Sequence, residues 1–274
     1  MFGFAVLADP HLGRNSLIVN WWDRYIPQSD KEVVGESIAE RLKKFVRVVN
    51  SEKDVRLVVS VGDNTESISP SQTQLLKEIM SGLNVPWLPI PGNHDMWPYE
   101  RDFSGQILWE AKEVLQFSSF KKIFNEEFEK LTDRVGDWQE QNGRLANFSF
   151  ICGNIQFIAI DNVNRQKASL KLPGVKSRKS AHPQSQQWLF KQLEETRKRK
   201  VIIISHAPMR LSLPNGLKRG KHEILMLSGH KHRYLFNKNG KISSLTAGAL
   251  YLDPIFPIIK EFEENGFDIG MKNF

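Results

Sequence analysis

The sequence has one cysteine and no long apolar run, and both shortages limit what the protein can be. Cys152 is the only cysteine among 274 residues, so no disulfide can form within the chain. A reducing compartment suits such a chain, and we expect a cytoplasmic location, although a secreted protein without disulfides would have the same composition. No apolar stretch reaches the roughly 20 residues that a membrane-spanning helix needs. The composition therefore argues against a disulfide-stabilised scaffold and indicates a globular protein with no membrane span.

Internal repeats are also absent, and acidic residues are outnumbered by basic ones. The absence of a repeat argues against a solenoid. A chain of 274 residues is long enough for one large domain, and we expect residues 1–274 to form a single domain. Lys and Arg number 38 and Asp and Glu 31, which gives a formal net charge of +7. This balance favours an anionic partner, such as a phosphate ester or a nucleic acid.

Strand-like and helix-like stretches alternate along most of the chain. Val55 to Val61 is apolar and β-branched, whereas residues 31–53 carry apolar side chains at helical spacing. Ser69-Pro70 predicts the start of another helix, with serine as N-cap and proline in the first turn. Asn239-Gly240, between alternating residues, predicts a hairpin. Alternating strands and helices followed by hairpins predict an α/β sandwich with mixed sheets.

Residues 96–140 interrupt this alternation. They are aromatic and charged, and apolar side chains recur at helical spacing from Ile107 to Leu131. We predict two helices here, inserted between elements of the sheets. Two roles are open for the insertion: a lid that covers one side of a site and selects substrate, or a helical pair that completes the core.

Five apolar strands each end in a polar cluster. The clusters are Asp9-Pro10-His11, Gly62-Asp63-Asn64, Gly92-Asn93-His94-Asp95, Ser205-His206 and Gly229-His230-Lys231-His232. Ligands of α/β folds bind at the carboxyl ends of the strands. We therefore expect these clusters to converge in space although they are far apart in the sequence. The glycines permit the sharp turns that bring backbone close to a site.

The side chains in these clusters are ligands of transition metals. Asp9 and His11 are two residues apart after a strand, so both side chains can reach one ion, and His230 and His232 repeat this spacing. A mixture of imidazole, carboxylate and amide oxygen suits Mn, Fe, Zn, Co or Ni better than Ca or Mg. Each cluster alone is weak evidence, but five of them at five strand ends predict a metal site. The candidate ligands are Asp9, His11, Asp63, Asn93, His206, His230 and His232.

In order and spacing, the clusters from Asp9 to His232 resemble those of the calcineurin-like metallophosphoesterase superfamily. The resemblance implies a four-layer αββα sandwich with two mixed β-sheets and a site for two metal ions. Carried over by position, it also implies a division of the ligands. The first ion would be bound by Asp9, His11 and His232, the second by Asn93, His206 and His230, and both by Asp63 as a bridge.

The same resemblance implies roles for two residues beside the ligands. His94 would lie just outside the metal ligands, near the leaving group, and Asp95 would orient it. The stretch from Val201 to Pro208 is similar to the branch with cyclic-nucleotide phosphodiesterase-like and acid-phosphatase-like proteins. Two departures from related groups stand out. Purple acid phosphatases usually carry a tyrosine ligand where this chain has Glu66, and lipid A pathway pyrophosphatases usually carry arginine in place of His94.

These observations predict an enzyme that hydrolyses a phosphomonoester or phosphodiester by attack of a metal-bound hydroxide. His94 would donate a proton to the leaving oxygen. Two other hypotheses are open. The basic balance favours a nuclease that acts on nucleic acid, and the fold could also serve as a catalytically silent scaffold for a protein partner. Silent members of such families tend to lose ligands, and none is missing here, which favours an enzyme.

Overall fold

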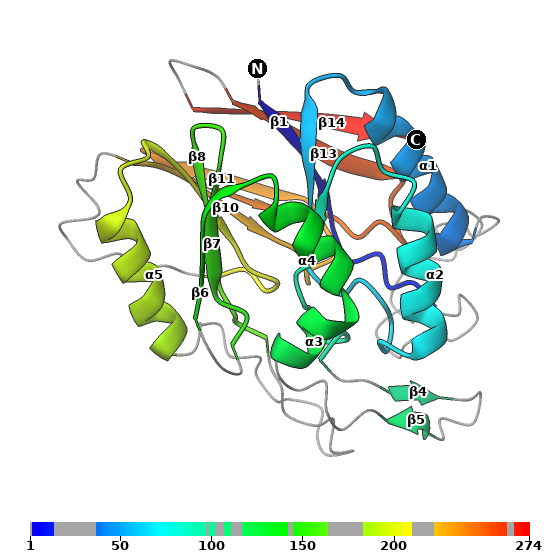
Figure 1. The fold of residues 1–274 in the computed structure, drawn as a ribbon. Coiled ribbons are helices and arrows are strands. Elements are labelled where there is room, and N and C mark those ends of the chain that lie inside the picture. Colours follow the sequence, from blue (N-terminus) through cyan, green and yellow to red (C-terminus); the bar gives the residue numbers. More distant parts are fainter. Residues whose placement is uncertain are drawn as a thin grey trace.

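Two β-sheets form the centre of the protein, with helices outside them (Figure 1). The structure is a computed structural model. It describes residues 2–13, 37–96, 99–101, 107–110, 117–141, 145–163, 183–209, 222–261 and 266–274. None of the helices in this part of the chain is both long and apolar enough to cross a membrane.

The first sheet has five strands in the order β14-β13-β1-β2-β3. Its central strand, β1 (Gly3–Leu7), runs parallel to β2 (Val55–Ser60), and β2 runs parallel to β3 (Trp87–Leu88). On the other side of β1 the pairing is antiparallel, first with β13 (Ile255–Glu261) and then with β14 (Phe267–Asn273). The sheet is therefore mixed, as predicted.

The second sheet has seven strands in the order β11-β12-β10-β9-β8-β7-β6. Strands β12, β10, β9 and β8 are parallel, and β11, β7 and β6 add antiparallel edges. Strands β11 and β12 form the hairpin predicted at Asn239-Gly240. The bounds are β6 (Gly136–Glu140), β7 (Phe148–Cys152), β8 (Ile155–Ala159), β9 (Lys200–Ile204), β10 (Glu223–Ser228), β11 (Leu235–Asn239) and β12 (Ile242–Thr246).

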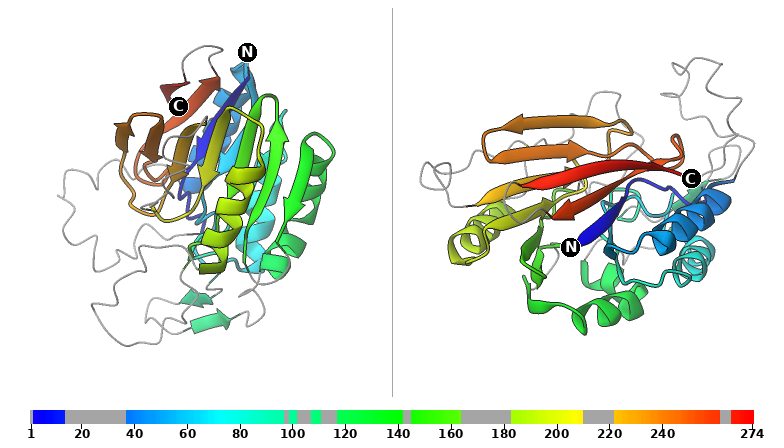
Figure 2. Two further views of the ribbon diagram at one scale, coloured as in Figure 1. Left: turned by 90° about the vertical axis from the view of Figure 1, so that its left-hand side faces the viewer. Right: turned by 90° about the horizontal axis from the view of Figure 1, so that it is seen from above.

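The inner faces of the two sheets meet, and each outer face is covered by helices. Phe4 of β1 and Phe157 of β8 are in edge contact across the sandwich, with ring centroids 5.4 Å apart. Because side chains alternate along a strand, the neighbouring Ile158 points outward, where it packs with Leu189 of α5 (Pro183–Glu195). Figure 2 shows the resulting order of helix, sheet, sheet and helix. This is the predicted αββα sandwich.

The helices on the outer face of the first sheet lie within the stretches where the sequence predicts them, and residues 31–36 of the first stretch lie outside the described residues. α1 (Ile38–Ser51) begins after Ser37, whose side chain accepts a hydrogen bond from the backbone of Glu40. α2 (Pro70–Met80) begins after Ser69, with proline in its first turn. Phe45 of α1 packs edge-on against Phe256 of β13 at 4.6 Å between ring centroids.

The insertion at residues 96–140 is only partly helical. It contains α3 (Phe117–Ile123) and α4 (Asn125–Thr132), as predicted, but residues 107–110, expected to be helical, form β5 (Ile107–Glu110). β5 pairs with β4 (Tyr99–Arg101) in a small separate sheet. Ile107 and Trp109 are two residues apart, a spacing that fits a strand as well as a helix, and strand pairing decides between them.

α3 and α4 bridge the edges of the two sheets. Phe124, between the two helices, meets Trp87 of β3 in the first sheet, and Phe117 of α3 stacks on Phe148 of β7 in the second, with ring centroids 5.8 and 5.5 Å apart. These helices therefore complete the core, which was one of the two roles open for the insertion. The lid hypothesis depends on the segment just before them. There Trp97 and Phe103 lie outside the described residues, and Tyr99 and Trp109 are described only as backbone.

Phe128→Ala tests whether this helical pair supports the whole domain. The Phe128 side chain is 2% exposed, and its ring contacts those of Phe117, Trp138 and Phe148. We expect the free energy of unfolding to fall by about 3–5 kcal/mol, as for other buried phenylalanines. Urea unfolding would measure it, with Leu75→Ala (39% exposed) as a surface control. A loss below about 1 kcal/mol would mean that α4 is not part of the core.

Candidate metal centre

The structure brings the five polar clusters together. One cluster follows each of β1, β2, β3, β9 and β10, at or within a few residues of the carboxyl end of the strand. Candidate ligand atoms from four of these strand ends fall into two groups, and within each group they lie within 4.8 Å of one another. The fifth strand end, after β3, contributes Asn93, whose amide oxygen reaches the second group. The convergence predicted from the sequence is therefore present in the structure.

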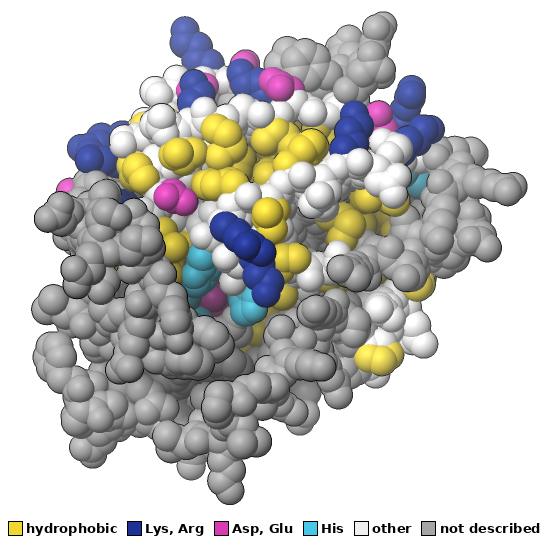
Figure 3. All heavy atoms as spheres, turned by 180° about the vertical axis from the view of Figure 1, so that it is seen from behind, with side chains coloured by type: hydrophobic (Ala, Val, Ile, Leu, Met, Phe, Trp, Pro, Cys, Tyr) yellow, Lys and Arg dark blue, Asp and Glu magenta, His cyan; other side chains and the backbone are white. Residues whose placement is uncertain are grey.

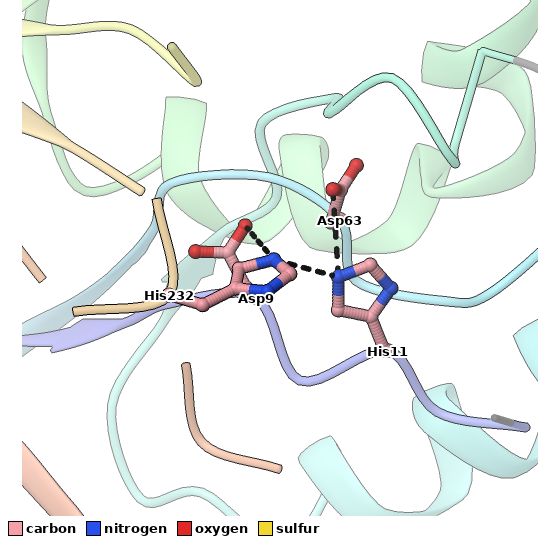
Figure 4. A group of neighbouring side chains, drawn as sticks. All are labelled: Asp9, His11, Asp63 and His232. Carbon is pink, nitrogen blue, oxygen red and sulfur yellow. Dashed lines mark hydrogen bonds and ion pairs between the residues drawn. The ribbon is translucent and has the colours of Figure 1, made fainter. Parts of the chain in front are cut away.

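The first group contains Asp9, His11, Asp63 and His232 (Figure 4). Nε2 of His11 lies 3.3 Å from Nε2 of His232 and 3.5 Å from Oδ2 of Asp63. Nε2 of His232 lies 4.0 Å from Oδ1 of Asp9. All four side chains thus direct a possible ligand atom toward one small volume.

The second group contains Asp63, His206 and His230. Nε2 of His206 lies 3.3 Å from Oδ2 of Asp63, 3.2 Å from Nδ1 of His230 and 3.0 Å from the amide oxygen of Asn93. Oδ2 of Asp63 is therefore within 3.5 Å of an imidazole nitrogen from each group, His11 in the first and His206 in the second.

The hydrogen bonds of the histidines leave lone pairs facing these two volumes. Nδ1 of His11 lies 2.8 Å from the Glu66 carboxylate, and Nδ1 of His206 lies 2.9 Å from the carbonyl oxygen of Val61. Because both partners are acceptors, each Nδ1 donates, and in the neutral ring Nε2 carries the lone pair. Lone pairs and carboxylate oxygens packed at 3.0–3.5 Å repel one another unless a cation lies between them. The donor set fits metal ions, whose histidine ligands are usually held this way.

The charges in the centre favour a positive charge beside the buried carboxylates. Burial raises the pKa of Asp9 to about 7, with the neighbouring Asp63 adding to the shift. Burial lowers the pKa of His206, but the Asp63 and Asp9 carboxylates outweigh it and raise the pKa to about 9. Burial and the neighbouring His206 lower the pKa of His230 to about 3, so this ring is neutral, as a ligand must be. A positive charge at Nε2 of His206, from a proton or a metal ion, stabilises the buried carboxylates.

Backbone strain is concentrated at the same residues. In the described part of the chain, seven residues other than glycine have positive φ, and five of them are candidate ligands. These five are Asp9, His11, Asp63, His230 and His232, with φ between 42° and 65°. This left-handed conformation is unfavourable for side chains with a Cβ and persists mainly at functional sites.

Two glycines of the polar clusters allow the backbone to approach the candidate ligands closely. A Cβ added to Gly92 would lie 2.1 Å from Oδ1 of Asp63, and one added to Gly229 would lie 2.3 Å from Oδ2 of Asp9. No real side chain tolerates such contacts. The backbone N–H of His230, next to Gly229, donates to both oxygens of Asp9 at 2.9 Å.

His94 and Asp95 lie beside the ligands and have different partners. The backbone N–H of His94 donates to Oδ1 of Asp63 at 2.8 Å, and its ring meets that of His11 edge-on at 4.6 Å between centroids. Nδ1 of His94 lies 2.9 Å from the carbonyl oxygen of Glu66. The buried Asp95 carboxylate accepts hydrogen bonds from Asn64, Thr65 and Gly92. Asp95 therefore ties together the loops after β2 and β3, and the carbonyl bonded to the His94 ring belongs to Glu66.

Two residues of the centre were not predicted as site residues. Glu66 joins His11 and His94, and together they form a third group of possible ligand atoms within 4.8 Å. Its place three residues after Asp63, where purple acid phosphatases usually carry a tyrosine ligand, is the sequence signal that would have identified it. The hydroxyl of Tyr251 lies 2.9 Å from Nδ1 of His232. No local pattern marks Tyr251, because the loop between β12 and β13 brings it to the site.

One side of the centre faces solvent. The side chains of His94 and His232 are 22% and 28% exposed, whereas Asp9, His11 and His206 are buried. Figure 3 shows histidine side chains at the surface, close to an acidic side chain and to Lys or Arg side chains. An anionic ligand could therefore reach the centre from this side.

Comparison with solved structures gives distant likenesses. The chain is 16% identical to GAP50, the anchor in the inner membrane complex of Plasmodium, with a TM-score of 0.49 and coverage of 99% of this chain and 84% of that one. A novel archaeal phosphodiesterase is 11% identical, with a TM-score of 0.42 and coverage of 99% of this chain and 100% of that one. The phosphopantetheinyl hydrolase PptH from Mycobacterium tuberculosis is 11% identical, with a TM-score of 0.44 and coverage of 91% of this chain and 90% of that one.

The sequence comparison is decisive at the level of the family. No curated protein matches the chain. The profile of the calcineurin-like phosphoesterases matches residues 2–234, which include all the candidate ligands. This match spans most of the chain, and the protein belongs to the calcineurin-like phosphoesterase family.

Proposed function

We propose that the protein is a phosphoesterase that uses two metal ions, bridged by Asp63, to hydrolyse a phosphate ester. The observation that carries the proposal is the position of Oδ2 of Asp63, 3.5 Å from Nε2 of His11 and 3.3 Å from Nε2 of His206. A single carboxylate oxygen between imidazoles of two ligand groups suits a bridge between two cations. Mn, Fe, Zn, Co and Ni are the ions that match the imidazole, carboxylate and amide donors.

The arrangement of the candidate ligands supports the division between two ions that the family resemblance implies. Asp9, His11 and His232 face one volume, and His206 and His230 face the other, together with the amide oxygen of Asn93. Metal ions held there would supply Lewis acidity and an activated water. The chain itself fixes the geometry, because phosphoryl transfer depends mainly on positioning and on neutralising charge.

His94 is the residue placed to move a proton. Its Nδ1 is bonded to the carbonyl oxygen of Glu66, so in the imidazolium ring Nε2–H is the acid that can be offered to a leaving oxygen. The Glu66 carboxylate lies 3.6 Å from the same Nδ1. Asp95 acts indirectly, by holding the loop on which Asn93 and His94 are carried.

Hydrolysis of two chromogenic esters would test the proposal. Bis(p-nitrophenyl) phosphate reports diesterase activity and p-nitrophenyl phosphate reports monoesterase activity, each measured with Mn, Ni, Co, Fe and Zn in turn. We expect metal-dependent release of nitrophenolate from at least one ester. A single-stranded oligonucleotide substrate tests the nuclease alternative, which the net charge of +7 favours. A chain that binds metal but hydrolyses none of these would support the scaffold alternative.

Metal content is a separate prediction. We expect two metal ions per chain after loading with Mn²⁺ and desalting, because the candidate ligands form two groups that share Asp63. Elemental analysis would measure the ratio. Treatment with a chelator should remove the ions and all hydrolysis, and Mn²⁺ should restore both. No more than a trace of metal in the loaded protein would contradict the two-ion centre.

A further inference from the structure

We propose that Tyr251 is a positioning residue that holds the imidazoles of His11 and His232. It thereby sets the metal affinity of the first site, which is the group with Asp9, His11 and His232, separately from that of the second site, which is the group with His206 and His230. The inference deepens the proposed function and rests on it. The Tyr251 hydroxyl lies 2.9 Å from Nδ1 of His232. Its ring meets the ring of His232 at 88° and the ring of His11 at 86°, with both centroids 5.2 Å away.

These contacts constrain the two ligands in different ways. The hydroxyl oxygen can accept the Nδ1–H of His232, which leaves the lone pair on Nε2, the atom 3.3 Å from Nε2 of His11. The aromatic ring packs edge-on against both imidazoles, which limits rotation of either ring about its Cβ–Cγ bond. Tyr251 therefore fixes the tautomer of His232 and the ring orientation of both His232 and His11.

The backbone that carries Tyr251 is itself tied to the site. Arg41 of α1, 4% exposed, donates from Nη1 to the carbonyl oxygens of Leu250 at 3.2 Å and Tyr251 at 2.7 Å. The backbone N–H of Leu250 donates to the carbonyl oxygen of Ala8 at 2.9 Å, one residue before Asp9. The loop is thus fixed both to α1 and to the strand end that carries the first ligand, so the ring of Tyr251 stays aligned with the imidazoles.

In the second site, the ring of His206 is held by other contacts. Nδ1 of His206 is bonded to the backbone carbonyl of Val61, and Asn93 and Asp63 contact its Nε2. Removing the Tyr251 hydroxyl leaves these bonds in place. Removal of the Tyr251 hydroxyl should therefore lower the metal affinity of the first site and leave that of the second unchanged. A general loss of structure would lower both.

Titration of the metal-free full chain with Co²⁺ tests the inference without measuring activity. In Tyr251→Phe, which keeps the ring, we expect one of two sites to bind Co²⁺ about 10- to 100-fold more weakly, the usual effect of losing such a partner, and the other to be unchanged. Tyr251→Leu, which also removes the ring, should weaken the same site at least as much. The matched control is Tyr234→Phe, which removes a hydroxyl that donates to Ile255 outside the centre and should leave both affinities unchanged.

A spectroscopic measurement identifies the affected ligand. In the Co²⁺-loaded protein, the ring N–H protons of the ligand histidines give strongly shifted NMR signals, and one of them should exchange faster with water in Tyr251→Phe. Unchanged affinities and exchange would overturn the inference, and so would equal weakening of both sites. If the unaltered chain takes up no Co²⁺, the metal centre itself is overturned. If it binds two ions but hydrolyses no ester, only the proposed catalytic function fails.

Discussion

Replacement of Asp63 by asparagine is expected to abolish binding of the metal pair and to lower turnover on the order of a thousand-fold or more, the upper range for loss of one stabilising group. The substituted atom is Oδ2, which lies between Nε2 of His11 and Nε2 of His206. An amide NH₂ in its place carries no negative charge and cannot bind a cation. The remaining amide oxygen can still accept the hydrogen bond from the backbone of His94, so the fold should survive.

Asp137→Asn is the matched control. Asp137 also has positive φ, 50° against 49° for Asp63, but it is exposed on β6 and outside the candidate ligands. Both substitutions thus replace a carboxylate by an amide at a left-handed residue, and only one of them changes the centre. Elemental analysis and hydrolysis of the preferred ester would be measured on both variants. Near-normal kcat in Asp63→Asn would show that Asp63 does not bridge the ions.

The sequence predicted the convergence at the site better than it predicted the details of the fold. Buried strands such as β2 and β9 end abruptly in polar residues, and parallel strands bring their carboxyl ends to one edge of a sheet. Asp9 and Asp63 follow the parallel strands β1 and β2 of the first sheet, and His206 and His230 follow the parallel strands β9 and β10 of the second. Placing the members of each pair together therefore required no knowledge of the connections between them. The spacing of Asp9 and His11 likewise depends only on local chain geometry.

Contacts made by distant loops were beyond this reasoning. Tyr251 reaches His232 through a loop whose position depends on Arg41 and on the end of β1. Such contacts leave no periodic signal in the sequence. The short strand β5 was not predicted for a related reason. The spacing of Ile107 and Trp109 fits both a helix and a strand, and only pairing with β4 makes this segment a strand.

The hydrogen-bond partners of Asp95 differ from the one that the resemblance implied. Asp95 follows His94 in the sequence, and the resemblance implied that it orients the neighbouring ring. In the structure its carboxylate instead accepts hydrogen bonds from the backbone of Gly92, Asn64 and Thr65. Adjacent side chains in a turn point in different directions, so sequence proximity did not identify the partner of the His94 ring.

Loss of the His94 imidazole is expected to separate proton transfer from metal binding. In His94→Ala both ions should remain, because the ring lies beside the ligands and its Nδ1 is bonded to the Glu66 carbonyl. We expect kcat on an alkyl phosphate ester to fall by about 100-fold or more, in the range of general-acid effects. On a p-nitrophenyl ester the fall should be smaller, because nitrophenolate leaves without a proton.

The comparison of the two esters decides what His94 does. His222→Ala is the matched control, since the His222 ring is bonded to the carbonyl of Lys198 outside the centre, and it should change neither rate. An equal loss on both esters with both metals retained would indicate that His94 stabilises charge in the transition state and does not donate the proton. Loss of one metal from His94→Ala would instead make His94 a ligand. The group of His11, Glu66 and His94 would then describe a coordination site, and the division of ligands between the two ions would have to change.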